Sequence, residues 1–322
     1  MDRRAFLGAL GLACAGPRGS LAQGAYPAGP IRLIVPSAAG SDMDAIARAL
    51  ARKLADNVHW SVAIENDAAA NGNHSLESVA RAAPDGYTLA LGCTANLTVH
   101  PALGAKLPVD PQIDLLPISQ VTSQALLLVV PPDSKFATVK DLAAGARAKP
   151  GTLRLGSAGK GTMSHLAGEL LQDRAGVRFG HAPAKDMRSA LEDLEGRKND
   201  FLFTNLRAVA TLLDKGLVRA VAVTSPGRLA THPDVPAIAE SYPGFDATVW
   251  TAIMAPARLS KYLVFQINIE VQHALERKDL QELLAADGIV GVGGPPQNFG
   301  DYLRAEYFKW AALFKANGMQ SL

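Results

Sequence analysis

The sequence predicts an α/β protein, and three observations support this fold class. The 322-residue chain is 48% apolar and 19% charged, so it can bury a large core and is not globally disordered. Its hydrophobic period changes repeatedly between about two and 3.6 residues, which indicates strands alternating with helices. Aromatic residues are 6% of the chain, while 29 glycines and 20 prolines mark many turns. We therefore expect two domains, or one large one, with parallel sheets flanked by helices.

The first half of the chain begins with an apolar run, residues 31–35, which is a buried strand that Pro36 ends. Apolar residues then recur at helical spacing, and the turn Ala83-Pro84-Asp85-Gly86-Tyr87 separates a helix from the strand that follows. The expected strands in this half are 31–35, 61–64, 88–91 and 126–130, and the expected helices are 44–55 and 75–82.

The second half repeats the alternation without a recognisable internal repeat. Its last helix is amphipathic and places Tyr302, Leu303, Trp310 and Phe314 on one side. Strands joined by helices put ligand sites outside the carboxyl ends of the strands. The expected strands are 153–155, 179–181, 201–203, 218–224 and 249–254, and the expected helices are 139–149, 162–171, 187–194, 208–215, 262–275, 280–286 and 299–314.

The first 22 residues have the pattern of an export signal. Arg3-Arg4 precedes an apolar run over 5–15 that is too short to span a bilayer, and Ser20-Leu21-Ala22 is a small-x-small cleavage pattern. The charged N-terminal part of this segment fits both a twin-arginine signal and an ordinary Sec signal. We expect cleavage after Ala22 and a mature protein in the periplasm. A lipoprotein cleaved at Cys14 is the alternative.

The charge balance argues against general nucleic-acid binding. The formal net charge is +2, but residues 1–22 hold three arginines and a single aspartate. The rest of the chain has 29 basic and 29 acidic residues and contains no basic run. Removal of the signal also removes Cys14 and leaves Cys93 alone, so we expect no internal disulfide.

The first of two informative loops follows the strand 31–35. It runs Ala38-Ala39-Gly40-Ser41-Asp42-Met43-Asp44 into the next helix. Small residues let a ligand approach the backbone, and a helix N-terminus offers unpaired N–H donors with a partial positive charge, so this loop is a candidate anion site. Ser41-x-x-Asp44 is also a capping-box pattern, and a capped helix start without a ligand is the alternative.

The second loop, Ser157-Ala158-Gly159-Lys160-Gly161-Thr162, leads into the helix expected at 162–171. Its glycines allow the backbone to pass close to a ligand, and we expect positive φ angles there. Gly161 separates Lys160 from Thr162, which excludes a P-loop. Gly156, Gly159 and Gly161 are wrongly spaced for a dinucleotide-binding fingerprint. The loop is therefore a second candidate anion site, unrelated to nucleotide hydrolysis.

Motif searches disfavour an enzyme and a metal site. The sequence has no Gly-x-Ser-x-Gly elbow and no evident nucleophile–base pair, and its seven histidines include no His-Glu-x-x-His. We interpret His165 as packing behind the second loop, and direct ligand contact is the alternative. The same interpretation and the same alternative apply to His181. Trp250 is assigned to the core, with a place in the cleft as the alternative. No cofactor is expected.

A series of motifs runs through the rest of the chain, from Tyr26-Pro27 to the C-terminal helix. In this order they resemble the periplasmic substrate-binding receptors of tripartite tricarboxylate transporters, the Bug-type receptors. The motifs are Pro36-Ser-Ala-Ala-Gly40 with Asp44, Glu65-Asn66 followed by Gly72-Asn73, Ala80-Arg-Ala-Ala-Pro-Asp-Gly-Tyr-Thr88, Asn96, Pro101-Ala-Leu103, Lys149-Pro-Gly151, Gly156-Ser-Ala-Gly159 with Gly161 and His165, and Leu217-x-Arg-Ala-x-Ala-Val-Thr-Ser225.

The resemblance implies a type II periplasmic binding protein fold, in which two α/β lobes joined by hinge strands close over a ligand. It divides the chain into a signal at 1–22, a first lobe at 23–124 and 226–322, and a second lobe at 125–225. It implies a monomeric receptor, not an enzyme, that captures a small carboxylate and delivers it to the permease subunits of the transporter. An orphan periplasmic sensor of the same fold, acting in signalling, is the alternative.

The resemblance also assigns the ligand site to the loops Ala38–Asp44 and Ser157–Thr162, with Asn96, Thr204 and Asn205 nearby. Several residues there depart from the family pattern. Asp42 adds a carboxylate that would repel an anion or favour an ammonium group, and Lys160 adds a cation. Thr204 replaces a common aspartate, and Ala184 replaces a common tyrosine. These changes leave the identity of the ligand open.

Overall fold

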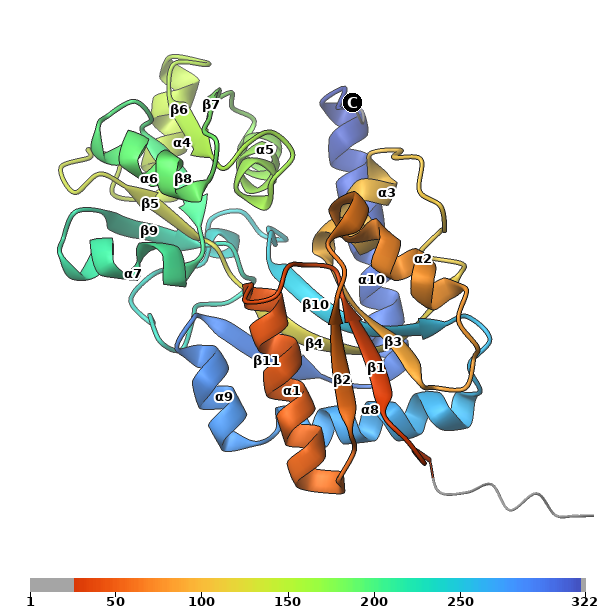
Figure 1. Cartoon of the computed structure of the whole chain (residues 1–322). Coiled ribbons are helices and arrows are strands. Elements are labelled where there is room, and N and C mark those ends of the chain that lie inside the picture. The colour runs from red at the N-terminus through yellow and green to blue at the C-terminus, as the bar shows by residue number, and fades with distance from the viewer. Residues whose placement is uncertain (1–25, 320–322) are drawn as a thin grey trace, which may run out of the picture.

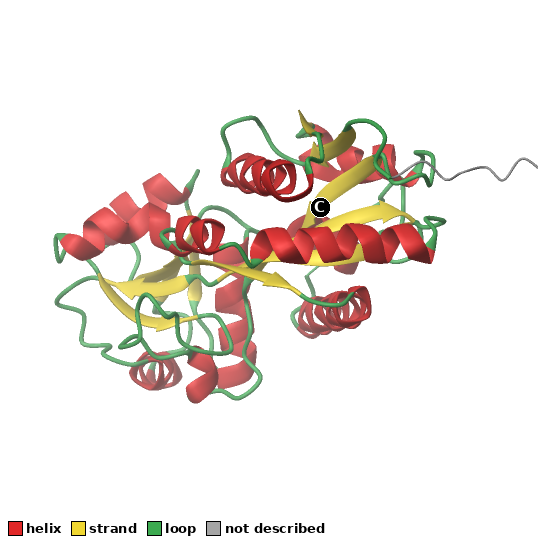
Figure 2. Cartoon of the chain, turned by 90° about the horizontal axis from the view of Figure 1, so that it is seen from below, coloured by secondary structure: helices red, strands yellow, loops and turns green. Residues whose placement is uncertain are grey.

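The computed structural model describes residues 26–319, which form two β-sheets flanked by helices (Figures 1 and 2). The export signal and its cleavage site lie outside the described residues. We call the six-stranded sheet with its helices the first lobe. Its strands, in spatial order, are β11 (Ile289–Gly293), β4 (Leu115–Gln124), β10 (Val249–Pro256), β3 (Thr88–Cys93), β1 (Ile31–Val35) and β2 (Val62–Asn66).

The five-stranded sheet forms the second lobe, which lies beside the first (Figure 2). The chain enters it directly from β4 and leaves it after its last strand to begin β10, so the lobes are joined by two crossings. Its strands, in spatial order, are β7 (Gly180–Pro183), β6 (Arg154–Ser157), β8 (Phe201–Thr204), β5 (Leu127–Val130) and β9 (Arg219–Val223).

Both sheets are mixed, which corrects the expectation of parallel sheets. Strand β1 pairs in parallel with β2 and β3, and β6 pairs in parallel with β7 and β8. The strand with which the chain enters each lobe after a crossing runs the other way: β10 is antiparallel to β3 and β4, and β5 is antiparallel to β8 and β9. The strands that lead into the crossings, β4 and β9, keep the direction of the parallel strands.

Helices cover the faces of both sheets. In the first lobe they are α1 (Asp42–Val58), α2 (Asn73–Ala80), the short α3 (His100–Ala102), α8 (Lys261–Leu275), α9 (Lys278–Ala285) and α10 (Pro296–Ala316), with the short turns η1 (Ala69–Gly72) and η2 (Ala95–Val99). In the second lobe they are α4 (Val139–Ala148), α5 (Met163–Ala175), α6 (Met187–Glu195) and α7 (Leu206–Asp214), with η3 (Ile238–Glu240) close to the crossing. Among residues 26–319, none of these helices is long and apolar enough to cross a membrane.

Most expected elements are present, but two strands were missed. The strand at 31–35 is confirmed with its expected ends. Strand β4 was missed because Pro117 and several polar residues interrupt its apolar pattern, and β11 was missed because Gly291 and Gly293 leave few apolar side chains in it. Both strands belong to the first lobe, and β4 leads into the first crossing.

Helix α10 connects the cores of the two lobes. Its first half places Phe299 and Leu303 in the core with Trp250, which is fully buried as expected. Its second half places Trp310 and Phe314 in the core formed by the second sheet and α5. Residues after 225 also pack with the second sheet as far as Ala247, which lies beyond the lobe boundary expected from the sequence.

Candidate functional site

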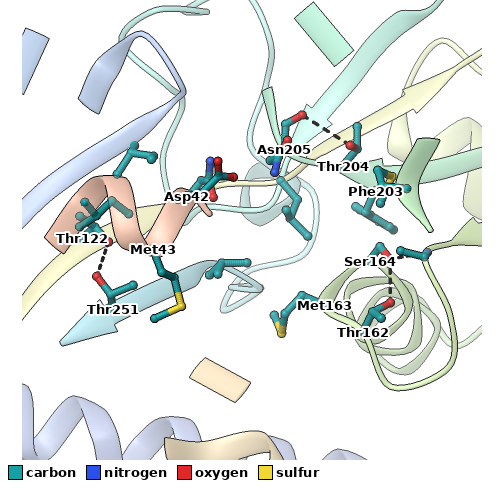
Figure 3. A pocket seen from close by; sticks show the side chains of 17 residues that line it. Asp42, Met43, Thr122, Thr162, Met163, Ser164, Phe203, Thr204, Asn205 and Thr251 are labelled. Atoms are coloured by element: carbon teal, nitrogen blue, oxygen red, sulfur yellow. Dashed lines mark hydrogen bonds between the residues drawn. The ribbon is translucent and has the colours of Figure 1, made fainter. Parts of the chain in front are cut away.

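A cavity of about 330 Å³ lies between the lobes, where side chains from both sheets meet (Figure 3). Its volume is that of a pocket for a small molecule. The first lobe contributes the start of α1 and parts of three strands: Asp42, Met43, Ile46, Thr122, Gln124, Val249, Thr251 and Ile289. The second lobe and the first crossing contribute Leu126, Ala158, Thr162, Met163, Ser164, Met187, Phe203, Thr204 and Asn205.

Three helices, α1, α5 and α7, begin at this cavity. The first turn of a helix has backbone N–H groups without intrahelical acceptors and carries partial positive charge. Ser41 caps α1 by accepting from the N–H of Asp44, and Asn205 caps α7 by accepting from the N–H of Ala208. Thr162, which precedes α5, makes no such side-chain bond. The start of α5 therefore keeps its donors available to an anion.

The loop before α5 has the backbone expected of it. Gly159 has a φ of 121° and Gly161 a φ of 82°, which confirms the expectation of positive angles. The hydroxyl of Thr162 donates to the carbonyl of Gly159 at 2.7 Å, and the N–H of Gly161 donates to Nδ1 of His165 at 3.1 Å. These bonds fold the loop onto the first turn of α5. Lys160, at the tip, is exposed and does not line the cavity.

A buried polar cluster supports this loop from behind. The Ser157 Oγ lies 2.7 Å from Nε2 of His181, and the rings of His181 and His165 stack with centroids 4.0 Å apart. The Nε2 of His165 lies 3.3 Å from a carboxylate oxygen of Glu169. Burial, and then the neighbouring His165, lower the pKa of His181 to about 4, so its ring is neutral at pH 7.

The contact between Ser157 and His181 is a serine–histidine pair that sequence reasoning missed, because 24 residues separate the two. Ser157 is fully buried, and its hydroxyl also contacts both backbone polar groups of Gly159. The pair therefore holds the loop in place, and its hydroxyl is not open to a substrate. His165 lies behind the loop, as expected, and its own ring is buried.

The loop before α1 is organised by Asp44. This carboxylate accepts from the N–H of Gly40 at 2.9 Å, from Nε of Arg48 at 3.0 Å and from Nδ2 of Asn66 at 3.0 Å. The hydrogen bonds from Arg48 and Gly40 lower the pKa of Asp44 to about 2. Only half of the expected capping box forms, because Asp44 bonds to Gly40 and not to the N-cap residue Ser41.

Asp42 faces the cavity from the first turn of α1 (Figure 3). The Nη1 of Arg207, on α7 of the opposite lobe, lies 2.9 Å from Oδ1 of Asp42 and 3.7 Å from Oδ2 of Asp287. The sequence led us to expect that the Asp42 carboxylate would repel an anion or favour an ammonium group, and the structure places the guanidinium of Arg207 beside it. Arg207 could not be foreseen, since 165 residues separate it from Asp42.

Five of the residues expected at the ligand site line the cavity: Asp42, Ala158, Thr162, Thr204 and Asn205. The others lie in the two loops beside or behind it, and Asn96 lies in the interior of the first lobe. There its amide bonds to the N–H of Cys93 and the carbonyl of Gly72. Sequence reasoning missed the apolar residues of the lining, above all Met163, Met187 and Phe203, and it included Met43 only as part of the first loop.

The described part of the chain offers no place for a metal ion. Among residues 26–319, no group of three or more histidines, cysteines, aspartates or glutamates lies close enough together to hold one. Cys93 is a free thiol, and burial raises its pKa. The site is therefore built from helix starts, hydroxyl and amide groups and apolar side chains.

Comparison with known proteins identifies the family. The sequence matches the tripartite tricarboxylate transporter family receptor over residues 46–319. The chain belongs to this family. It is therefore a solute-binding receptor of the tripartite tricarboxylate transporter type. The receptor is 34% identical to the protein BugT of Bordetella pertussis over 309 residues, which cover 95% of each chain.

Solved structures share the two-lobed fold of the receptor. The periplasmic binding protein BugD is 30% identical, with a TM-score of 0.71, and the match covers 92% of the receptor and 100% of BugD. The R. palustris protein Rpa4515, solved with adipate, is 28% identical with a TM-score of 0.75, and the match covers 92% of the receptor and 100% of that chain. The type II periplasmic binding protein fold expected from the sequence is thus confirmed.

Proposed function

We propose that the receptor captures a small organic carboxylate in the cavity between its lobes and delivers it to the permease subunits of a tripartite tricarboxylate transporter. The observation that carries the proposal is the convergence of α1, α5 and α7 on one cavity lined by both lobes. Helix starts stabilise anions by backbone hydrogen bonds and by the helix dipole. The adipate bound by the related R. palustris protein is a ligand of this chemical class.

The uncapped start of α5 is the proposed carboxylate site. Its first-turn donors belong to Met163 and Ser164, both of which line the cavity. Hydrogen bonds to a charged group are typically worth about 1.5–3 kcal/mol each. Thr162, Thr204 and Asn205 add hydroxyl and amide groups around this position. The loop residues Ser157, Gly159 and Gly161 act by holding this start in place, and Lys160 lies at the exposed tip of the loop.

Ligand capture is proposed to close the lobes. The boundaries expected from the sequence lie at about residues 124 and 225, and we propose that the segment 229–247, which packs with the second sheet, moves with the second lobe. A ligand that contacts both lobes would stabilise their closed arrangement, since binding to the native state adds to its stability.

The place of action is proposed to be the periplasm. The sequence pattern of residues 1–22 supports export, and the mature chain would begin at Gln23. N-terminal sequencing of the exported protein should give Gln23, and a lipid-modified N-terminus at Cys14 would contradict it. Within this proposal the receptor acts as a monomer, uses no cofactor and catalyses no reaction, and the hydroxyl of Ser157, which pairs with His181, is buried.

A thermal-shift panel tests the proposal. The mature receptor is heated with aliphatic monocarboxylates, dicarboxylates, tricarboxylates, aromatic carboxylates and acidic amino acids, and with matching neutral amides as controls. We expect at least one carboxylate, and none of its amide counterparts, to raise the melting temperature in a concentration-dependent way. If no carboxylate shifts the melting temperature, the proposed function loses its basis.

A further inference from the structure

The charge of the cavity lining restricts its ligand. Within the described part of the chain, the lining contains no lysine, arginine or histidine, and Asp42 is its one ionisable residue. Arg207 already pairs with this carboxylate. A carboxylate bound here must therefore rely on backbone donors, and each additional carboxylate needs a further set of them, because a buried charge without partners is strongly destabilising.

The three helix starts differ in what they can offer. The start of α5 is free of a side-chain cap. The start of α1 is capped by Ser41 and carries Asp42 in its first turn, so its positive end is already opposed by a negative charge. The start of α7 is capped by Asn205, and each cap occupies a single N–H group, that of Asp44 in α1 and that of Ala208 in α7. The clearest difference is therefore one of charge: Asp42 disfavours a carboxylate at α1, whereas the first turn of α5 carries no acidic residue.

Three polar side chains that the first lobe contributes to the lining already have hydrogen-bond partners. The hydroxyl groups of Thr122 and Thr251 share a hydrogen bond of 2.6 Å, and the amide of Gln124 donates to the carbonyl of Asp287 at 3.2 Å. A hydrophilic ligand would have to compete with these bonds. An apolar ligand leaves them intact.

Apolar side chains from both lobes form the remainder of the lining. Met43 comes from α1, Met163 from α5, Met187 from α6, and Phe203 from β8. The three methionines are partly exposed, although each packs against a core of its lobe. Methionine adapts to irregular shapes and makes favourable contacts with aromatic rings. A ligand with an apolar part would cover these side chains and bury apolar surface of both lobes at once, which favours binding.

We propose that the ligand is an organic monoanion, with a single carboxylate at the start of α5 and an apolar alkyl or aryl body held between the methionines and Phe203. Hydrophilic dicarboxylates and tricarboxylates are disfavoured by Asp42, which opposes a further carboxylate at α1, and by the apolar side chains that line the rest of the cavity. This inference rests on the proposed function and narrows it to one class of carboxylate.

Matched probes test this inference by titration calorimetry on the mature receptor. Hexanoate and adipate have the same six-carbon chain and differ by one carboxylate, benzoate replaces the alkyl body by a ring, and malate is small and hydrophilic. We expect hexanoate or benzoate to bind at least tenfold more tightly than adipate and malate. If hexanoate binds more tightly than benzoate, the body of the ligand is an alkyl chain, and the reverse order indicates an aryl body. Tighter binding of adipate or malate overturns the inference but leaves the proposed function standing. Absence of binding by all four overturns the inference, and the wider thermal-shift panel then decides the proposed function.

A methionine variant locates the apolar body. Met163→Gln keeps the length of the side chain but makes it polar, so hexanoate and benzoate should bind about fivefold to tenfold more weakly. Met163→Leu keeps the position apolar and should remain within about twofold of wild type. Circular dichroism and the melting temperature check that both variants fold. If Met163→Gln binds both probes as tightly as wild type does, the ligand body does not lie against Met163 and the inference fails.

Discussion

Arg207 and Asp42 form an ion pair that joins the two lobes across the cavity, with Nη1 of the arginine 2.9 Å from Oδ1 of the aspartate. Arg207 lies at the start of α7 in the second lobe, and Asp42 opens α1 in the first. The two side chains are 58% and 49% exposed, so the pair contributes at most about 1 kcal/mol to stability. Its larger effect is on the charge that an entering anion meets.

The two partners of this pair should affect anion binding in opposite directions. Asp42→Asn removes a negative charge from the cavity and should strengthen carboxylate binding by about threefold to tenfold, with a larger gain for adipate than for hexanoate. Arg207→Ala leaves Asp42 unpaired and should weaken binding by a similar factor. The double variant should return close to wild type. Calorimetry at low and high salt checks the electrostatic origin, because screening should shrink the affinity differences of both single variants from wild type. A change of the same sign in both single variants would contradict this account.

Gly159 should matter for binding because its φ of 121° suits glycine alone. In Gly159→Val the loop is strained and the donors at the start of α5 are displaced, so carboxylate affinity should fall by about tenfold or more. Gly151 offers a matched control, since it also has a positive φ, of 74°, and lies outside the cavity lining. Gly151→Val should lower the melting temperature without changing affinity. Equal affinity losses in the two variants would show that the effect is global and not local to the loop.

His181 should make the receptor less stable as the pH falls from about 6.5 to about 4. Its pKa in the folded protein, about 4, is below the value of 6.5 in an unfolded chain, so over this range the unfolded state binds more protons. The contribution of the neutral His181 ring to the free energy of unfolding is complete above pH 6.5 and is lost progressively as the pH falls toward 4. Urea unfolding at several pH values should give a shallower pH dependence for His181→Gln than for wild type. Parallel curves for the two proteins would contradict the assignment.

Glu306 should be a large contributor to stability. Its buried carboxylate accepts from Nε1 of Trp250 at 3.2 Å and from Nε1 of Trp310 at 3.3 Å, and it contacts the ammonium group of Lys309. Glu306→Ala leaves two indole N–H groups without their acceptor and removes the carboxylate partner of Lys309, which keeps only the carbonyl of Asp246, so it should cost about 3–5 kcal/mol in urea unfolding. Glu306→Gln keeps one acceptor oxygen and should cost less. A loss below about 1 kcal/mol for Glu306→Ala would mean that water replaces the carboxylate.

The sequence predicted elements whose signals are local. Ile31–Val35 is a short apolar run ended by a proline, and α1 has a clear apolar face, so both were located. Strand β4 was missed because it is specified by its partners: it lies between β10 and β11, and its Thr122 hydroxyl shares a hydrogen bond with Thr251 of β10. Long-range pairing of this kind leaves little trace in a single sequence.

The site was predictable only in outline. Both loops were found, because small residues before a helix are a local pattern, and the positive φ angles of Gly159 and Gly161 followed from it. The partner of Asp42 and the pairing of Ser157 with His181 arise from residues brought together by the fold. The methionines of the lining looked like ordinary core residues, since a partly buried methionine on a helix has the same sequence pattern in either role.

The position of a bound carboxylate tests the central claim most directly. A crystal structure of the mature receptor would be determined with the panel carboxylate that raises the melting temperature most. We predict that the carboxylate lies in the cavity between the lobes, within hydrogen-bonding distance of the backbone N–H groups of Met163 and Ser164, with the rest of the ligand against Met43 and Phe203. A ligand bound outside this cavity, or one whose carboxylate faces Asp42 and leaves the start of α5 empty, would contradict the account.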